Sequence, residues 1–209
     1  MKKLFLSQVV EDSSLDFISL DFVDSKDVLL IDDCESFAEF EIVLNLQSKV
    51  KLNYLLKIEN AKFDCLSRKI TVNLLSEYSD ACLKISAKLQ PSQTVFIKTN
   101  QVHLASNSKS DLIVKSVLEE NSKINCENLI RIEKDLKNVI ACENSKSLSL
   151  SKNVKVIFIP KLEVESKDVI CKHGAAFSSL NEEQLFYLQS RGISLQQSKE
   201  MLTDSFLKI

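Results

Sequence analysis

The chain is poor in the residues that build the commonest catalytic loops. Its 209 residues include two glycines, two prolines, two histidines and no tryptophan. Two glycines cannot form a Gly-rich phosphate-binding loop or a G-x-S-x-G nucleophile elbow, and two histidines leave little for a catalytic triad or a multi-His metal site. Because glycine is so scarce, we expect Gly174 and Gly192 to lie where the backbone needs a positive φ or a close approach.

A strong charge of one sign and a long apolar run are also lacking. The formal net charge is -2, with basic residues scattered among acidic ones, so nucleic-acid binding is not expected. No apolar run approaches the roughly 20 residues that span a bilayer. Residues 1–11 resemble the first half of a signal peptide, but Ser7 and Gln8 interrupt the apolar part and Glu11 ends it. We therefore expect an ordinary first strand or helix, and a cytoplasmic protein without membrane contact.

The cysteines do not follow a metal-finger or disulfide spacing. No two of them form a C-x-x-C pair, and in a cytoplasmic chain free thiols are expected. Five are expected to be small apolar side chains packed inside strands, and Cys171 is the exception for the reason given below. The five are Cys34, Cys65, Cys82, Cys126 and Cys142.

Apolar and polar residues alternate through most of residues 38–170, which is typical of β-strands. No amphipathic helix separates the strands, so a βαβ sheet is disfavoured and a sandwich, a barrel or a β-solenoid remains. Strand-like pieces recur about every 10 to 15 residues, which favours a solenoid slightly, although a sandwich fits almost as well. Asn, Asp and Ser replace Gly in the turns, which we expect at 59–60, 79–80, 106–108, 120–122, 127–128, 143–145 and 152–153.

The last thirty residues change to a helical pattern. Asn181 and Gln184 form a capping-box arrangement, and Ser194 and Gln197 form a second. Gly192 stands where a glycine commonly ends a helix. The sequence thus predicts a helical hairpin that closes the β body. The apolar cluster of its first helix is expected to form mainly core between the helices and the β body, with some of it facing outward toward a partner; the cluster is Leu185, Phe186, Tyr187 and Leu188. The second helix carries Met201, Leu202 and Phe206 on one side.

Cys171 and His173 are the candidate metal ligands. They lie two residues apart at the end of a strand-like run, so both side chains project from one face. Sulfur and imidazole nitrogen both bind iron, zinc or an iron–sulfur cluster. Two ligands are too few for a closed site, and a buried Cys with a hydrogen-bonded His remains the plainer interpretation. His103 fits a satisfied core or surface histidine better than a ligand, and it stays a possible structural or functional residue. A polysaccharide-cleaving solenoid remains possible, but no feature of the sequence supports it.

The C-terminal motifs resemble a known family. The segment Asp168-Val-Ile-Cys-Lys-His-Gly-Ala-Ala-Phe177, followed by Glu182-Glu-Gln-Leu-Phe-Tyr-Leu-Gln-Ser-Arg-Gly-Ile193, is similar to the C-terminal signature of the SufD branch of the SufB/SufD family of iron–sulfur cluster assembly scaffolds. The resemblance covers roughly residues 95–207. The chain departs from the family pattern in being shorter, at Cys126 and Asn128 (aromatic and Gly in the family) and at Ala176 (Thr in the family).

The resemblance implies a right-handed parallel β-helix with a C-terminal helical hairpin, and a subunit that is not itself an enzyme. It implies a heterodimer with a SufB-like subunit through the β-helix, and contact with the SufC ATPase through the helical end, at Leu185, Phe186, Tyr187, Arg191 and Gly192. Cys171 and His173 would then lie at the SufB interface and share iron or a transient Fe–S cluster that this chain alone does not hold stably.

Two alternatives to a SufD-like subunit stay open. The chain could be a purely structural β-helix subunit with an inert Cys-x-His pair, or a sole SufB/SufD-like chain that works as a homodimer. The expected organisation is an irregular N-terminal segment with short edge strands at 1–35, a β-helix core at 36–178 and the hairpin at 179–209.

Overall fold

The computed structural model describes residues 2–9, 17–24, 27–32, 38–59 and 63–209. Within them the chain is mainly β, and two helices follow the last strand. The elements are β1 (Lys2–Phe5), α1 (Leu6–Val9), β2 (Phe17–Phe22), β3 (Val28–Asp32), β4 (Glu39–Leu46), β5 (Lys51–Ile58), β6 (Cys65–Leu74), β7 (Asp80–Leu89), β8 (Thr94–His103), β9 (Lys109–Leu118), β10 (Lys123–Ile132), β11 (Lys137–Ser149), β12 (Lys155–Val164), β13 (Asp168–Ser179), α2 (Glu182–Ser190) and α3 (Leu195–Leu207).

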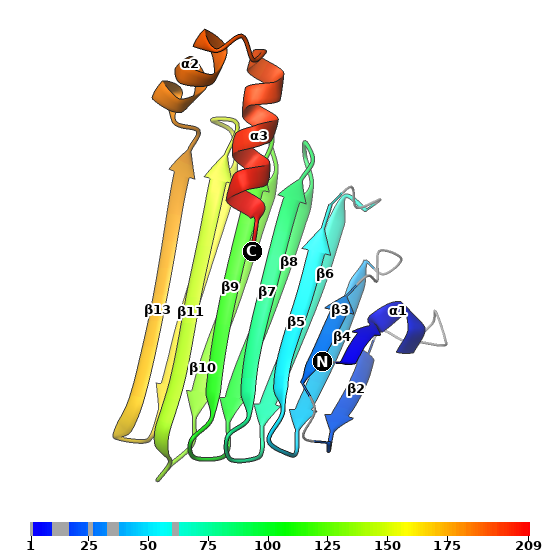
Figure 1. The fold of residues 1–209 in the computed structure, drawn as a ribbon, viewed down its shortest axis with the longest axis vertical. Helices are drawn as coiled ribbons and strands as arrows, with labels where there is room; N and C mark the ends of the chain where they lie inside the picture. The colour runs from blue at the N-terminus through cyan, green and yellow to red at the C-terminus, as the bar shows by residue number, and fades with distance from the viewer. Residues whose placement is uncertain (1, 10–16, 25–26, 33–37, 60–62) are drawn as a thin grey trace.

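Successive strands alternate between two parallel sheets. The odd-numbered strands form a seven-stranded sheet in the order β1-β3-β5-β7-β9-β11-β13, and the even-numbered strands form a six-stranded sheet in the order β12-β10-β8-β6-β4-β2. Each pairing in both sheets is parallel. Figure 1 shows the strands side by side along one axis, from β2 at one end to β13 at the other. This is a β-solenoid with two strands per turn, so the solenoid prediction is confirmed and the sandwich is excluded.

The strand register sets the repeat, which alternation alone did not reveal. Cys65 pairs with Thr94, and Thr94 pairs with Lys123, so each of these turns contains 29 residues. Asp80 and Lys109 give the same spacing in the other sheet. The last turn of the six-stranded sheet is longer, because Lys123 pairs with Lys155. A constant repeat places equivalent side chains directly above one another, turn after turn.

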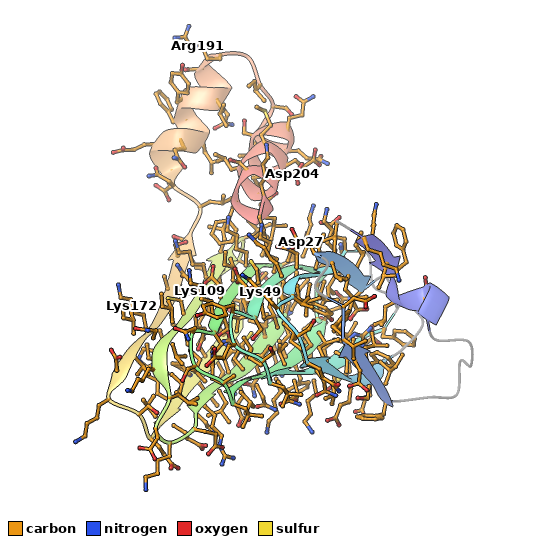
Figure 2. All side chains as sticks on the ribbon, turned by 60° about the horizontal axis from the view of Figure 1, so that its bottom comes forward. Asp27, Lys49, Lys109, Lys172, Arg191 and Asp204 are labelled. Atoms are coloured by element: carbon orange, nitrogen blue, oxygen red, sulfur yellow. The ribbon has the colours of Figure 1, made fainter. Side chains whose placement is uncertain are left out.

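The core fills the space between the two sheets. Every second residue of β4 to β11 points inward and is buried, and the side chains in this space are chiefly Leu, Ile and Val. Figure 2 shows side chains packed between the sheets. The inward ladder Ile42–Ile70–Thr99–Asn128 shows that the interior is apolar in the early turns and becomes polar toward the C-terminal end.

The turns confirm part of the expectation and correct part of it. Asn107 and Asn121 have positive φ, as predicted for turns that lack glycine. The turns expected at 127–128 and 143–145 are wrong, since these residues lie inside β10 and β11. Polar residues at inward positions were mistaken there for a break in the strand. Residue 60 of the turn at 59–60, the 35/36 boundary and Cys34 fall outside the described residues.

The cysteines are less uniformly buried than expected. Cys126 is buried in the core, as predicted. Cys65 is exposed, and Cys82 and Cys142 are half-buried on the outward face of their strands. These three side chains occupy outward positions in the alternation of their strands. That a cysteine lies in a strand-like run does not by itself show which face its side chain takes.

Both helix starts follow the sequence prediction. Asn181 Oδ1 accepts hydrogen bonds from the backbone N–H groups of Glu183 and Gln184, and Ser194 forms a capping box with Gln197. Gly192, between the helices, has φ +83°. Gly174 needs neither a positive φ nor a close approach, because a Cβ there would meet nothing nearer than 4.0 Å, so that expectation was wrong. No helix in the described segments is long and apolar enough to cross a membrane.

In the described segments the hairpin packs on the β body chiefly through its second helix. In α3, Leu207 is buried and belongs to a cluster with Val117 and Leu148, and the Lys115 ammonium of β9 donates to the Lys208 carbonyl oxygen at 2.8 Å. α2 has no buried residue. Arg191 lies at the far end of the hairpin, away from the sheets (Figure 2). The expectation that the α2 apolar residues are mainly core was therefore wrong, since α2 contacts α3 instead of the sheets.

Candidate functional site

Cys171 and His173 lie on β13, the last strand of the seven-stranded sheet. Cys171 pairs with Ala141 and His173 pairs with Glu143, and both of these β11 residues are buried in the solenoid interior. Paired residues of adjacent parallel strands share a face, so Cys171 and His173 face the interior side as well. Cys171 is half-buried and packs against the small cluster that contains Ala141, whereas His173 is exposed.

The exposure of His173 follows from its position at the open end of the solenoid. β12 and β13 are the terminal strands of the two sheets, and no further turn covers them in the described part of the chain. Inward-phase side chains that are buried in earlier turns are therefore uncovered here; Phe177 is 57% exposed. We call this open end of the solenoid the mouth. Its walls are β12 and β13 of the last turn, and its floor is formed by β10 and β11 of the turn below.

The floor of this mouth is a buried polar column. Thr99 Oγ1 donates to Asn128 Oδ1 at 2.9 Å, and Asn128 Nδ2 donates to Glu143 Oε1 at 2.7 Å. Ser145 Oγ also donates to Glu143 Oε1, at 3.2 Å. Glu143 is only 3% exposed, and its second oxygen, Oε2, is buried without a hydrogen-bond partner. The column ends directly below His173, because Glu143 and His173 are paired in register.

Burial opposes negative charge on the two acidic groups of the mouth, Glu143 and Cys171. Burial raises the pKa of the Glu143 carboxyl, and this is opposed by the hydrogen bonds from Asn128 and Ser145 and by the nearby His173. Burial, with a smaller contribution from Cys142, raises the pKa of the Cys171 thiol. Cys171 alone is thus no activated nucleophile, and a bound metal ion is what would deprotonate it.

The side chains in their present positions do not form a finished metal site. No three His, Cys, Asp or Glu side chains of the described segments lie close enough together to hold an ion. The assignment of Cys171 and His173 as ligands of a half-site stays a prediction.

His103 lies one turn below β10 and has a structural environment. It lies in β8, fully buried, with Nδ1 2.7 Å from Ser108 Oγ and Nε2 2.8 Å from Ser110 Oγ. Burial lowers the pKa of the His103 imidazole to about 4, so the ring is neutral at physiological pH. It is a satisfied core histidine, one of the two environments considered from the sequence.

The residues expected to contact a partner lie on or beside α2. Phe186 is 74% exposed and Tyr187 is 58% exposed, and the Arg191 guanidinium lies 5.3 Å from the centre of the Tyr187 ring. Leu185 is half-buried, and Gly192 makes the sharp link to α3. Two adjacent exposed aromatic rings on a helix that barely touches its own domain are typical of a docking surface. Their role stays a prediction.

Sequence reasoning missed the floor of the mouth. Asn128, Glu143 and Ser145 were assigned to turns because they are polar and follow one another closely with other polar residues. Their position in the alternation could have revealed them. Val139, Ala141, Glu143 and Ser145 stand at every second position and so share one face of a strand, and the first two are apolar. Polar residues that continue an apolar inward phase indicate a buried network.

A family model covers most of the chain. Residues 41–206 match the model described as "SUF system FeS cluster assembly, SufBD core domain". The match includes the open mouth, its polar floor and nearly all of the helical hairpin.

Curated proteins give the same result. The chain is 27% identical over 179 residues to the iron–sulfur cluster assembly protein SufB of Bacillus subtilis, covering 84% of this chain and 35% of that protein. It is 39% identical over 77 residues to the chloroplastic protein ABCI7 of Arabidopsis thaliana, covering 37% of this chain and 16% of that one. It is 26% identical over 110 residues to the SufBD family protein ycf24 of Galdieria sulphuraria, covering 53% of this chain and 50% of that one. The chain thus spans half or less of the length of these relatives.

Proposed function

The chain belongs to the SufBD core-domain family of SUF iron–sulfur cluster assembly proteins, and from this premise we propose that it is a SufD-like scaffold subunit of the cytoplasm. In this role it has no catalytic turnover of its own. It pairs with a SufB-like subunit through the open end of the solenoid, binds the SufC ATPase through the helical hairpin, and presents Cys171 and His173 to iron, sulfide or a nascent cluster, which is cargo and not a resident cofactor.

The open last turn carries the proposal. β12 and β13 have 10 and 12 residues, and their outer edges present unpaired backbone groups in the described structure. Long exposed edges invite pairing with another chain, and proteins normally cover or interrupt them. The turn also leaves apolar inward-phase side chains uncovered, among them Leu162 and Phe177. A second β-solenoid of the same family would cover both the edges and these side chains.

The placement of the ligand pair supports a SufD-like role at this interface. Cys171 and His173 face the mouth that a docked solenoid would close, so their missing ligands can come from the partner. The sequence around them has the Cys-x-His-Gly form of the SufD branch. The relatives found include SufB, so the SufD assignment rests on this motif.

The hairpin supports the ATPase contact. α2 projects Phe186 and Tyr187 into solvent beyond the end of β13, while α3 anchors the hairpin on β9 (Figure 1). A force applied to α2 would therefore reach the sheet next to the mouth through a packed helix.

Co-expression with SufB and SufC of the same organism, followed by affinity purification, tests the partner assignment. We expect both proteins to co-purify with the chain. The double variant Phe186→Ala, Tyr187→Ala should lose SufC and keep SufB. Phe96→Ala is the matched control, because Phe96 is an exposed aromatic on the outer face of β8. A wild-type chain that purifies as a monomer with neither partner contradicts the proposal, and one that purifies as a homodimer without SufB supports the homodimeric scaffold.

Anaerobic cluster reconstitution of the complex tests the ligand role. His173→Ala should lower the cluster yield, and Lys172→Ala should leave it unchanged, because Lys172 points to the opposite face of β13. Equal yields from His173→Ala and wild type would leave the chain a purely structural subunit.

A further inference from the structure

Glu143 is a buried carboxylate that the fold leaves half satisfied. Oε1 accepts hydrogen bonds from Asn128 and Ser145, but Oε2 has no partner although the residue is 3% exposed. Burying an ionised carboxylate is costly unless it is paired or binds a metal. The other buried carboxylate of the described segments, Asp32, is paired: Tyr54 Oη donates to it at 2.6 Å, and Arg68 Nε lies 3.7 Å away.

Glu143 lies where it can meet the predicted ligand pair. His173 is its register partner on the adjacent strand, and Cys171 is the partner of Ala141, two residues before Glu143. All four residues face the same side, and adjacent strands are about 4.8 Å apart. His173 is exposed and free to change rotamer, whereas Glu143 is fixed by its hydrogen bonds. A turn of the His173 ring toward the floor would bring nitrogen, sulfur and oxygen donors together.

We propose that Glu143 is the third ligand of a divalent-cation site that Cys171 and His173 begin, and that the site binds a transition-metal cation of the Fe²⁺, Co²⁺ and Zn²⁺ class. This deepens the proposed function and rests on it for its cargo. Thiolate, imidazole and carboxylate together suit such cations, and three protein ligands leave a position open for sulfide or for a partner residue. On binding, the Cys171 thiol loses its proton to solvent as the Cys–metal bond forms.

Asn128 and Ser145 are positioning residues in this site. They hold Oε1 from the opposite sheet and from the same strand, so the carboxylate keeps Oε2 directed away from them. Hydrogen bonds of this kind orient metal-binding carboxylates. This gives a physical account of Asn128, which stands where the family pattern has a glycine.

Anaerobic titration of the purified chain with Co²⁺ tests the proposal, because a Cys–Co²⁺ bond gives a thiolate charge-transfer absorption band. We expect the wild type to show this band and Cys171→Ser to lack it. Glu143→Gln should weaken Co²⁺ affinity about tenfold or more. Glu127→Gln is the matched control, since Glu127 lies on the outer face of β10, in an ion pair with Lys161 at 2.5 Å, and it should bind Co²⁺ like the wild type.

Thermal unfolding distinguishes a metal-ligand role of Glu143 from a purely structural role. Glu143→Gln keeps the shape and the Oε1 acceptor, so thermal unfolding should occur at the same temperature as in the wild type or higher. Unchanged Co²⁺ affinity in Glu143→Gln, or no Co²⁺ binding by the wild type, overturns this inference. Neither result bears on whether SufB and SufC co-purify with the chain. Conversely, failed co-purification together with Glu143-dependent Co²⁺ binding overturns the partner assignment and leaves this site standing.

Discussion

His103 gives the chain a specific dependence of stability on pH. The side chain is fully buried, its two ring nitrogens are within hydrogen-bonding distance of Ser108 and Ser110, and burial lowers its pKa from 6.5 to about 4. The folded chain therefore binds this proton less readily than the unfolded chain does. The contribution of the neutral ring to stability is complete above pH 6.5 and is lost as the pH falls toward 4.

The size of the effect follows from the two pKa values. Across the whole window the unfolding free energy should fall by about 3 kcal/mol, and about 2 kcal/mol of this should be lost by pH 5. Carboxylates titrate at the acid end of the same range, so the wild type alone does not isolate the histidine. His103→Gln supplies the reference, because its amide is uncharged at every pH and can still bond to the serine hydroxyls.

Urea unfolding of both proteins, followed by circular dichroism between about pH 8 and pH 4.5, measures the difference. The unfolding free energy of the wild type minus that of His103→Gln should decrease steadily below pH 6.5. A difference that stays constant within about 0.5 kcal/mol over this range would show that His103 is protonated as easily in the folded chain as in the unfolded one, and would refute the reasoning.

Two further predictions concern the backbone and the polar column. Gly192→Ala forces a non-glycine residue to φ +83°, at a cost of about 1 kcal/mol that should accelerate amide hydrogen exchange in α2 and α3 about fivefold; Gly174→Ala, where a Cβ has room, should leave the exchange unchanged. Equal exchange in the two variants would contradict this. Asn128→Ala removes the donor to Glu143 Oε1 and should lower the unfolding free energy in urea by about 1–3 kcal/mol, and a loss below about 0.5 kcal/mol would show that the column does not stabilise the fold.

Local patterns in the sequence predict where helices and strands lie better than they predict which strands pair with each other. The caps at Asn181 and Ser194 and the alternation in the strands depend on neighbours within a few residues, and both were recovered. The choice between sandwich and solenoid depends on which strand lies beside which. That choice is fixed by contacts about one turn apart, such as Thr94 with Lys123, and alternation is identical in either case.

The candidate site shows the same contrast between residues that are close in the sequence and residues that only strand pairing brings together. Cys171 and His173 lie two residues apart in the sequence, and their spacing was enough to predict them as ligands. Glu143 lies one turn earlier and Asn128 lies in the opposite sheet, so only the register of β10, β11 and β13 brings them together. The exposure of Phe186 and Tyr187 was misjudged because helical periodicity shows that a face is apolar but not what covers it.

The middle turns of the solenoid, each 29 residues long, could be removed or added as whole units. Each turn touches only the turn before it and the turn after it, so the chain behaves as a stack in which stability passes from neighbour to neighbour. Removing or adding one complete turn between β6 and β8 would preserve every inward and outward phase. A change of one residue inside a strand would invert the inward and outward phases of the residues that follow it in that strand. Members of very different length can therefore keep the same terminal mouth, as long as they differ by whole layers of the stack.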